Sequence, residues 1–180
     1  AEIEAIKECL HREDVRLVTL TGTGGVGKTR LALQAANELR GDFKDDVFFV
    51  PLASVTQPQH VLSVIAQSIG LRMAEKSPSQ NLAAHFAHRH ALLVLDNFEH
   101  LLSAAPLISE LLTSTQLLKV LVTSRVQLHL YGERRFIVQP FDLPNANAEI
   151  TDLTQNDAVT LFVERAQAVQ SNFHLTKDNV

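Results

Sequence analysis

Short runs of consecutive apolar residues alternate along the chain with longer stretches in which apolar residues recur every three or four positions. Runs of about four to eight apolar residues are typical of strands buried on both faces. A period of three to four residues is typical of amphipathic helices. The runs predict strands at residues 17–21, 47–52, 91–96, 118–123 and 135–138. The period predicts helices at residues 1–12, 31–39, 58–69, 79–89, 99–113 and 158–169.

The order of these elements indicates the architecture. Strands that alternate with helices form parallel β-α units, and such units build a three-layer α/β fold with helices on both faces of one sheet. The second strand contains Pro51. Because proline cannot donate a hydrogen bond to a neighbouring strand, we expect this strand at the edge of the sheet.

The domain organisation follows from a stretch rich in proline and asparagine after the last predicted strand. We expect residues 1–140 to form the core and residues 141–153 to form a linker. Residues 154–180 then form the start of a further helical subdomain that the sequence truncates. The helix in this part begins with Thr154 and Asp157, which have the spacing of a capping box.

Composition places the chain among ordinary globular proteins. Of its 180 residues, 46% are apolar and 20% are charged, and the net charge of −4 gives no reason to expect direct contact with nucleic acid. Cys9 is the only cysteine, which excludes an internal disulfide and a thiolate zinc site. No apolar run reaches the roughly 18 residues of a membrane span, and no signal peptide is visible. We therefore expect a cytoplasmic protein.

The loop after the first strand matches two phosphate-binding patterns. Gly22, Gly24 and Gly27 fit the dinucleotide fingerprint G-x-G-x-x-G, and the same segment with Lys28 and Thr29 fits the triphosphate loop G-x-x-x-x-G-K-T. The dinucleotide reading needs a carboxylate at the end of the second strand, about 20 residues on. That strand ends in Val-Pro-Leu-Ala. The triphosphate reading is therefore favoured.

The triphosphate reading assigns a role to each part of the loop. Glycines let successive backbone N–H groups face phosphate oxygens at the N-terminus of the following helix. Lys28 is expected to reach the β- and γ-phosphates, and the hydroxyl of Thr29 to coordinate Mg²⁺. The predicted nucleotide-binding residues are Gly22, Thr23, Gly24, Gly25, Val26, Gly27, Lys28, Thr29 and Arg30.

A triphosphate site also needs a carboxylate for Mg²⁺ where the strands end beside the loop. Asp96 ends the third predicted strand and is the candidate, although an aspartate there also suits a helix cap. The next position, where an acidic residue usually activates water, is Asn97. Glu99 is the nearest carboxylate. It either takes that catalytic role or serves as a favourable negative charge in the first turn of a helix.

The fourth predicted strand leads to a further candidate. Arg125 follows it directly, where a guanidinium would contact the γ-phosphate, or would be an exposed arginine at a strand end. Thr123 and Ser124 are placed to bond the attacking water or the loop. The histidines at 85, 88, 90 and 100 form a loose cluster, but a solvated helix face explains them better than a metal site does.

Four segments resemble one family of proteins: TGTGGVGKTRLAL, LLVLDNFEHLL, VLVTSR and AVTLFVERA. In this order they resemble the nucleotide-binding domain of STAND ATPases, relatives of NB-ARC and AAA+ proteins. The similarity is strongest to those of bacterial LuxR-type and antibiotic-regulatory transcription regulators. The resemblance implies a P-loop fold with a five-stranded parallel sheet in the order 5-1-4-3-2. It also implies that Asp96 serves Mg²⁺ and that Arg125 senses the γ-phosphate.

The resemblance further implies an ATP/ADP switch in a larger signalling protein. Its partners would be the nucleotide, DNA-binding or helical-repeat domains of the same chain, and other copies in a nucleotide-dependent oligomer. The family usually has a second acidic residue where this chain has Asn97. Two hypotheses therefore stay open: a slow signalling ATPase, or a nucleotide-gated interaction module with little or no hydrolysis.

Overall fold

The computed structural model describes residues 2–71, 77–142, 153–176 and 179. The chain divides into two compact units, residues 1–138 and residues 139–180. The first unit contains the sheet, and the second contains the helix α7 (Asp157–Val169). None of the helices in the described part of the chain is both long enough and apolar enough to cross a membrane.

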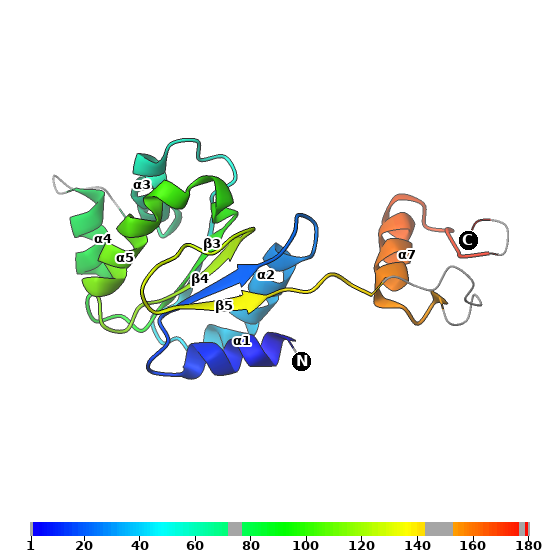
Figure 1. Cartoon of the computed structure of the whole chain (residues 1–180), viewed down its shortest axis with the longest axis horizontal. Helices are drawn as coiled ribbons and strands as arrows, with labels where there is room; N and C mark the ends of the chain where they lie inside the picture. Colours follow the sequence, from blue (N-terminus) through cyan, green and yellow to red (C-terminus); the bar gives the residue numbers. More distant parts are fainter. Residues whose placement is uncertain (1, 72–76, 143–152, 177–178, 180) are drawn as a thin grey trace. The chain divides into compact units, whose positions relative to one another are not determined.

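Within the described residues, five parallel strands form the sheet, in the order β2-β3-β4-β1-β5 (Figure 1). They are β1 (Leu17–Thr21), β2 (Val47–Pro51), β3 (Leu92–Asp96), β4 (Lys119–Ser124) and β5 (Glu133–Ile137). From the other edge the order reads 5-1-4-3-2, so the predicted sheet is confirmed. Pro51 lies in an edge strand, where a missing N–H costs no ladder bond.

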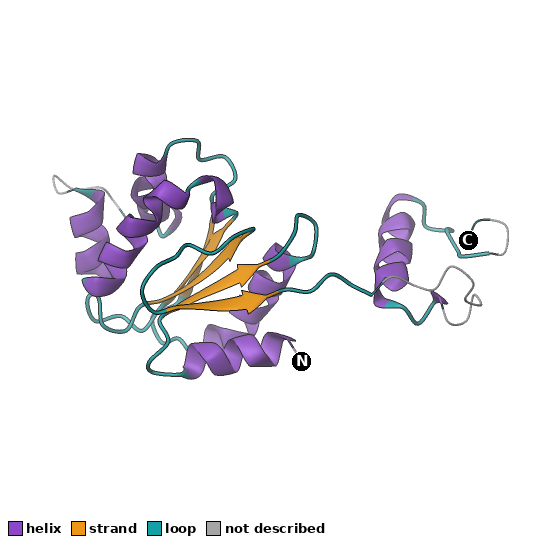
Figure 2. Cartoon of the chain, in the orientation of Figure 1, coloured by secondary structure: helices purple, strands orange, loops and turns teal. Residues whose placement is uncertain are grey.

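Helices cover both faces of the sheet (Figure 2). The helices of one face are α1 (Glu2–His11) and α2 (Lys28–Glu38), and those of the other are α3 (Val61–Ser68), α4 (Pro78–Phe86) and α5 (Ala105–Thr113). Successive strand residues point to opposite faces. Leu92 and Val94 therefore join the core under α1 and α2, and Leu93 and Leu95 join the other core. The predicted three-layer α/β fold is confirmed.

The segment after β3 differs from the single helix predicted over residues 99–113. Two 3₁₀ turns, Phe98–His100 and Leu102–Ala104, precede α5. Pro106 lies in the first turn of α5, the part of a helix that tolerates a residue without an N–H. Elsewhere, α4 ends at Phe86 rather than at residue 89, and β5 begins at Glu133 rather than at residue 135.

In the second unit, the predicted capping box of Thr154 and Asp157 is wrong. The N-cap of α7 is Asn156, whose Oδ1 accepts hydrogen bonds from the backbone N–H groups of Ala158 (3.0 Å) and Val159 (3.3 Å). Asparagine is as strong an N-cap as serine or aspartate. Most of the predicted linker, residues 143–152, lies outside the described residues.

Candidate nucleotide-binding site

The glycine loop connects β1 to α2, and its shape requires its glycines. Gly25 and Gly27 have φ angles of +82° and +97°, a conformation that L side chains rarely adopt. Gly22 is required for another reason. A Cβ there would lie 2.8 Å from the carbonyl oxygen of Val138 and 2.9 Å from Cγ1 of Val26. The loop is therefore compact against the end of the sheet.

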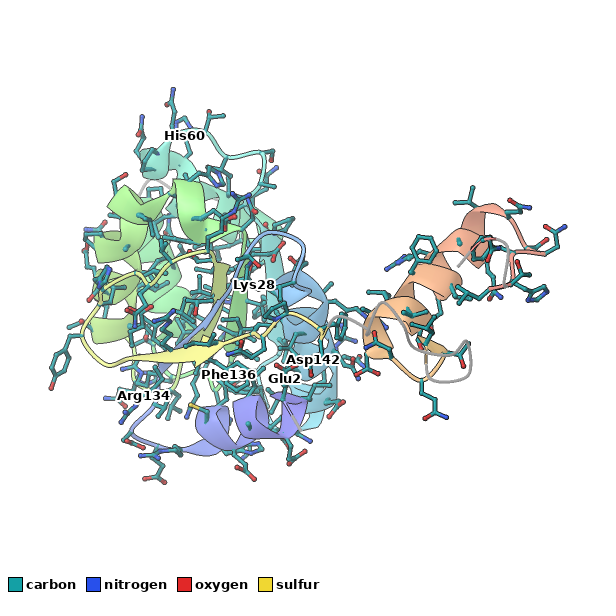
Figure 3. All side chains as sticks on the ribbon, turned by 45° about the vertical axis from the view of Figure 1, so that its right-hand side comes forward. Glu2, Lys28, His60, Arg134, Phe136 and Asp142 are labelled. Atoms are coloured by element: carbon teal, nitrogen blue, oxygen red, sulfur yellow. The ribbon has the colours of Figure 1, made fainter. Side chains whose placement is uncertain are left out.

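Lys28 lies at the end of the sheet beside this loop (Figure 3). The residue is only 9% exposed, and its Nζ donates hydrogen bonds to the carbonyl oxygens of Gly22 (3.0 Å) and Thr23 (2.8 Å). No carboxylate of the described residues forms an ion pair with it. A largely buried cation without a counter-ion favours an anion, so the loop fits a phosphate group.

The backbone of the loop offers further donors. The N–H groups of Thr23, Gly24 and Gly25 donate no hydrogen bond to any residue that the structure describes. The loop also leads directly into the N-terminus of α2, where Gly27 is the N-cap. Free N–H groups at a helix N-terminus attract anions. Arg30, also predicted to bind nucleotide, is exposed in the first turn of α2 and makes no ion pair with a described residue.

Asp96 is where three elements meet. Its Oδ1 accepts hydrogen bonds from the hydroxyl of Thr29 in α2 (2.7 Å) and from the hydroxyl of Thr123 in β4 (2.6 Å). The contact arises because the carboxyl ends of adjacent parallel strands lie at one edge of the sheet. The hydroxyl and carboxylate oxygens are hard ligands of the kind that Mg²⁺ prefers, and they fit the metal that accompanies a triphosphate.

A second network fixes Asn97. Its backbone has left-handed angles, φ 67° and ψ 51°, and its N–H donates to Oγ1 of Thr123 at 2.9 Å. Its side-chain amide lies 3.4 Å from Nδ1 of His100, whose Nε2 donates to the carbonyl oxygen of Val55 at 2.8 Å. The sequence indicated Thr123 as a ligand of water or of the loop, whereas the structure bonds it to Asp96 and Asn97. The sequence singled out His100 only as part of a loose histidine cluster and did not predict these contacts.

Arg125 and Glu99 form an ion pair at the same edge of the sheet. Nε of Arg125 donates to Oε1 of Glu99 at 3.0 Å, with the arginine side chain 65% exposed and the glutamate 17% exposed. The guanidinium lies beside the glycine loop, because a Cβ on Gly24 would be 3.7 Å from its Nη2. The sequence did not predict this pair. Ser124 accepts a bond from the backbone of Val126 instead of contacting the loop.

No group of three histidine, cysteine, aspartate or glutamate side chains among the described residues could hold a metal ion. A cation at this site would therefore depend on Thr29, Asp96 and the oxygens of a bound phosphate. That ligand set is typical of Mg²⁺ at nucleotide sites, where a few protein oxygens act together with the substrate and water.

Comparisons with known proteins bear on this site. A family model described as "AAA domain" matches residues 11–137. A Mycobacterium tuberculosis protein named as an HTH-type transcriptional regulator is 40% identical over 166 residues, which cover 91% of this chain and 17% of that protein. The chain thus spans about a sixth of the length of this curated relative.

Two solved structures are similar in fold. Cdc6p from Pyrobaculum aerophilum has a TM-score of 0.58 at 14% identity, covering 92% of this chain and 48% of that one. A Pyrococcus horikoshii STAND protein with a tetratricopeptide repeat sensor has a TM-score of 0.49 at 15% identity, covering 94% of this chain and 25% of that one.

Proposed function

Because the chain belongs to the AAA domain family, we propose that it binds ATP with Mg²⁺ and acts as a regulatory ATP/ADP switch. The predicted resemblance to nucleotide-binding domains of bacterial transcription regulators is confirmed by the family match and by the HTH-type relative. The observation that carries the proposal is the Lys28 ammonium held inside the glycine loop next to the Thr29–Asp96 contact.

In this proposal, the loop from Gly22 to Arg30 binds the phosphates. Its free N–H groups and Lys28 receive the negative charge, with Lys28 directed to the β- and γ-phosphates. Thr29 and Asp96 hold Mg²⁺, and the metal would neutralise charge on the phosphate oxygens. Arg125 senses the γ-phosphate, since its guanidinium lies beside Gly24. The loss of that contact after hydrolysis would distinguish ADP from ATP.

Two observations favour slow turnover. The usual acidic position carries Asn97, whose side chain faces His100, and the carboxylate of Glu99 is engaged by Arg125. Removal of a positioned base typically costs about 10²–10⁴-fold in rate. A catalytic role of Glu99 would require it to leave Arg125. The second candidate function, a nucleotide-gated interaction module with little hydrolysis, rests on the same two contacts.

We extend the proposal to a larger protein because the chain spans only 17% of its HTH-type relative. Residues 1–140 would be the nucleotide-binding core, 141–153 a linker, and 154–180 the start of a helical subdomain. The partners would be DNA-binding or helical-repeat domains of the same chain and other copies in a nucleotide-dependent oligomer. The segment itself would not touch nucleic acid, and the protein would work in the cytoplasm.

The test is calorimetric titration of the chain with ATP and Mg²⁺. Lys28→Ala should weaken binding by at least about tenfold, since it removes charge-assisted hydrogen bonds to phosphate. The fold should survive, because water can solvate the released loop carbonyls. Lys44→Ala, at an exposed lysine of the same unit, is the matched control and should bind like the wild type. Equal affinity of a folded Lys28→Ala variant would refute the assignment.

A further inference from the structure

The ion pair between Glu99 and Arg125 has a geometry that assigns a role to Glu99. We infer that Glu99 is a positioning residue, which holds Arg125 in the orientation that reads the γ-phosphate of a bound triphosphate. The inference rests on the proposed function and goes beyond it, because it concerns how the sensor is kept ready before nucleotide arrives.

Glu99 is the fixed member of the pair. It lies in the 3₁₀ turn Phe98–His100, which the fully buried ring of Phe98 anchors in the core. The left-handed backbone of Asn97 turns the chain out of β3 just before it. The carboxylate therefore has a defined place. Arg125 has a long and largely exposed side chain, and among the described residues only Glu99 forms a hydrogen bond or ion pair with its guanidinium.

The bond uses the nitrogen that phosphate recognition does not need. A guanidinium has five N–H donors, and Glu99 accepts only from Nε. The terminal Nη groups stay available, and Nη2 is the group that lies next to Gly24. Because bidentate binding of phosphate can use the two Nη groups, Glu99 and a phosphate can bind Arg125 together.

The second carboxylate oxygen strengthens this argument. Oε2 of Glu99 is shielded from solvent and has no hydrogen-bond partner in the described part of the chain. A carboxylate that is shielded from water and accepts few hydrogen bonds carries a free-energy cost, so the ion pair of Glu99 with Arg125 is favoured. Arg125 is thereby ordered in advance, and the entropy cost of ordering it does not fall on nucleotide binding. The same shielding disfavours Glu99 as the base, because Oε2 is not open to an attacking water.

The test is a double-mutant cycle on the full chain, with ATP and ADP titrated separately in the presence of Mg²⁺. Glu99→Ala should weaken ATP binding by about two- to tenfold, which corresponds to the free-energy cost of ordering one long side chain. The same variant should leave the affinity for ADP unchanged. Arg125→Ala should weaken ATP binding by at least about tenfold. The double variant should match Arg125→Ala, because Glu99 acts only through Arg125.

Two variants act as controls. Glu99→Gln should keep most of the preference for ATP, because its amide oxygen still accepts a hydrogen bond from Nε of Arg125. If Glu99→Ala does not fold, Glu99→Gln still tests the inference. Glu8→Ala, at an exposed glutamate of α1, should bind ATP and ADP with the affinities of the wild type.

The inference would be overturned by tighter ATP binding by Glu99→Ala, by an equal loss of ADP binding, or by an effect of Glu99→Ala that persists without Arg125. Tighter binding would mean that Glu99 competes with the phosphate. Unchanged ATP binding by Glu99→Ala, with binding that still depends on Lys28, would remove the inference and leave the proposed function intact. Binding that does not depend on Lys28 would remove both.

Discussion

A single oxygen, Oδ1 of Asp96, joins the loop helix to the sheet. It accepts from Thr29 of α2 and from Thr123 of β4. Thr123 in turn accepts from the backbone N–H of Asn97, so one hydroxyl fixes the carboxylate and the start of the next turn. The arrangement holds the proposed metal ligands in place before any ion binds. Such fixed ligands suit Mg²⁺, which requires near-ideal octahedral geometry and gives up its bound water reluctantly.

At the scale of single residues, we predict that Asp96→Asn separates nucleotide binding from its dependence on Mg²⁺. The amide keeps an oxygen that accepts from Thr29 and Thr123, so the fold and metal-free ATP binding should stay near wild type. The charge that faces the metal is lost. The strengthening of ATP binding by Mg²⁺ over EDTA should therefore fall by about tenfold or more, measured by calorimetry.

Asp42→Asn is the matched control, because Asp42 is an exposed aspartate whose partner is His11, away from the loop. It should leave the effect of Mg²⁺ unchanged. An unchanged effect in Asp96→Asn as well would mean that another residue holds the metal.

The position of Asp96 could be predicted from the sequence, whereas its contacts could not. An apolar run that ends in aspartate places the carboxylate at the carboxyl end of a buried strand. The pairing of Glu99 with Arg125 depends on side-chain rotamers and on the left-handed turn at Asn97, and neither has a signature in the pattern of apolar positions. The functional roles of these residues stay proposals.

At the scale of elements, the junction between the glycine loop and α2 determines the direction of the helix. Gly27 is its N-cap, with a φ of +97°, and Lys28 and Thr29 follow in the first turn. The left-handed residue turns the chain sharply, so the first turn of the helix faces the ends of β3 and β4. The functional side chains are thus placed by one backbone conformation.

We predict that Gly27→Ala destabilises the first unit by about 1–2 kcal/mol, the cost of a left-handed conformation for a residue with a Cβ. Gly41→Ala is the matched control. Gly41 ends a 3₁₀ turn, is not among the glycines with positive φ, and has open space around it. That substitution should be neutral or stabilising by up to about 1 kcal/mol. Urea unfolding of both variants measures the difference, and equal stabilities would contradict the prediction.

The elements themselves could be predicted where they are apolar throughout or amphipathic. The strands buried on both faces were placed within one residue at each end. β5 was placed less well, because the charged residues Glu133, Arg134 and Arg135 occupy its first positions. An edge strand pairs on one side only and tolerates such residues, so its start lacks the apolar signal.

At the scale of the whole molecule, the loop and the exit of the sheet are in direct contact. Val138 is the last residue of the first unit, and its N–H donates to the carbonyl oxygen of Thr21 at 2.8 Å. Its own carbonyl oxygen would lie 2.8 Å from a Cβ on Gly22. The start of the glycine loop and the point where the chain leaves for the second unit therefore constrain each other.

We predict that Gly22→Ala affects both the glycine loop and the exit of the sheet at Val138. The new methyl group has to displace Val138 or Val26, at a cost of about 1–3 kcal/mol for overpacking. ATP binding should weaken, and amide exchange at Val138 should accelerate. In Gly24→Ala, the Cβ meets only the Arg125 guanidinium at ordinary contact distance, so exchange at Val138 should be unchanged. Hydrogen exchange followed by NMR distinguishes the two variants.

The crowding of Gly22 against Val138 also limits how the gene can change. Every missense change of a glycine codon introduces a Cβ, so every such change at position 22 pushes on the carbonyl oxygen of Val138. The reverse does not hold, because the closest approach of Val138 is through its main-chain oxygen, which all amino acids share. Codon 138 should therefore accept several small apolar residues in a mutational scan, while codon 22 accepts none without loss of stability.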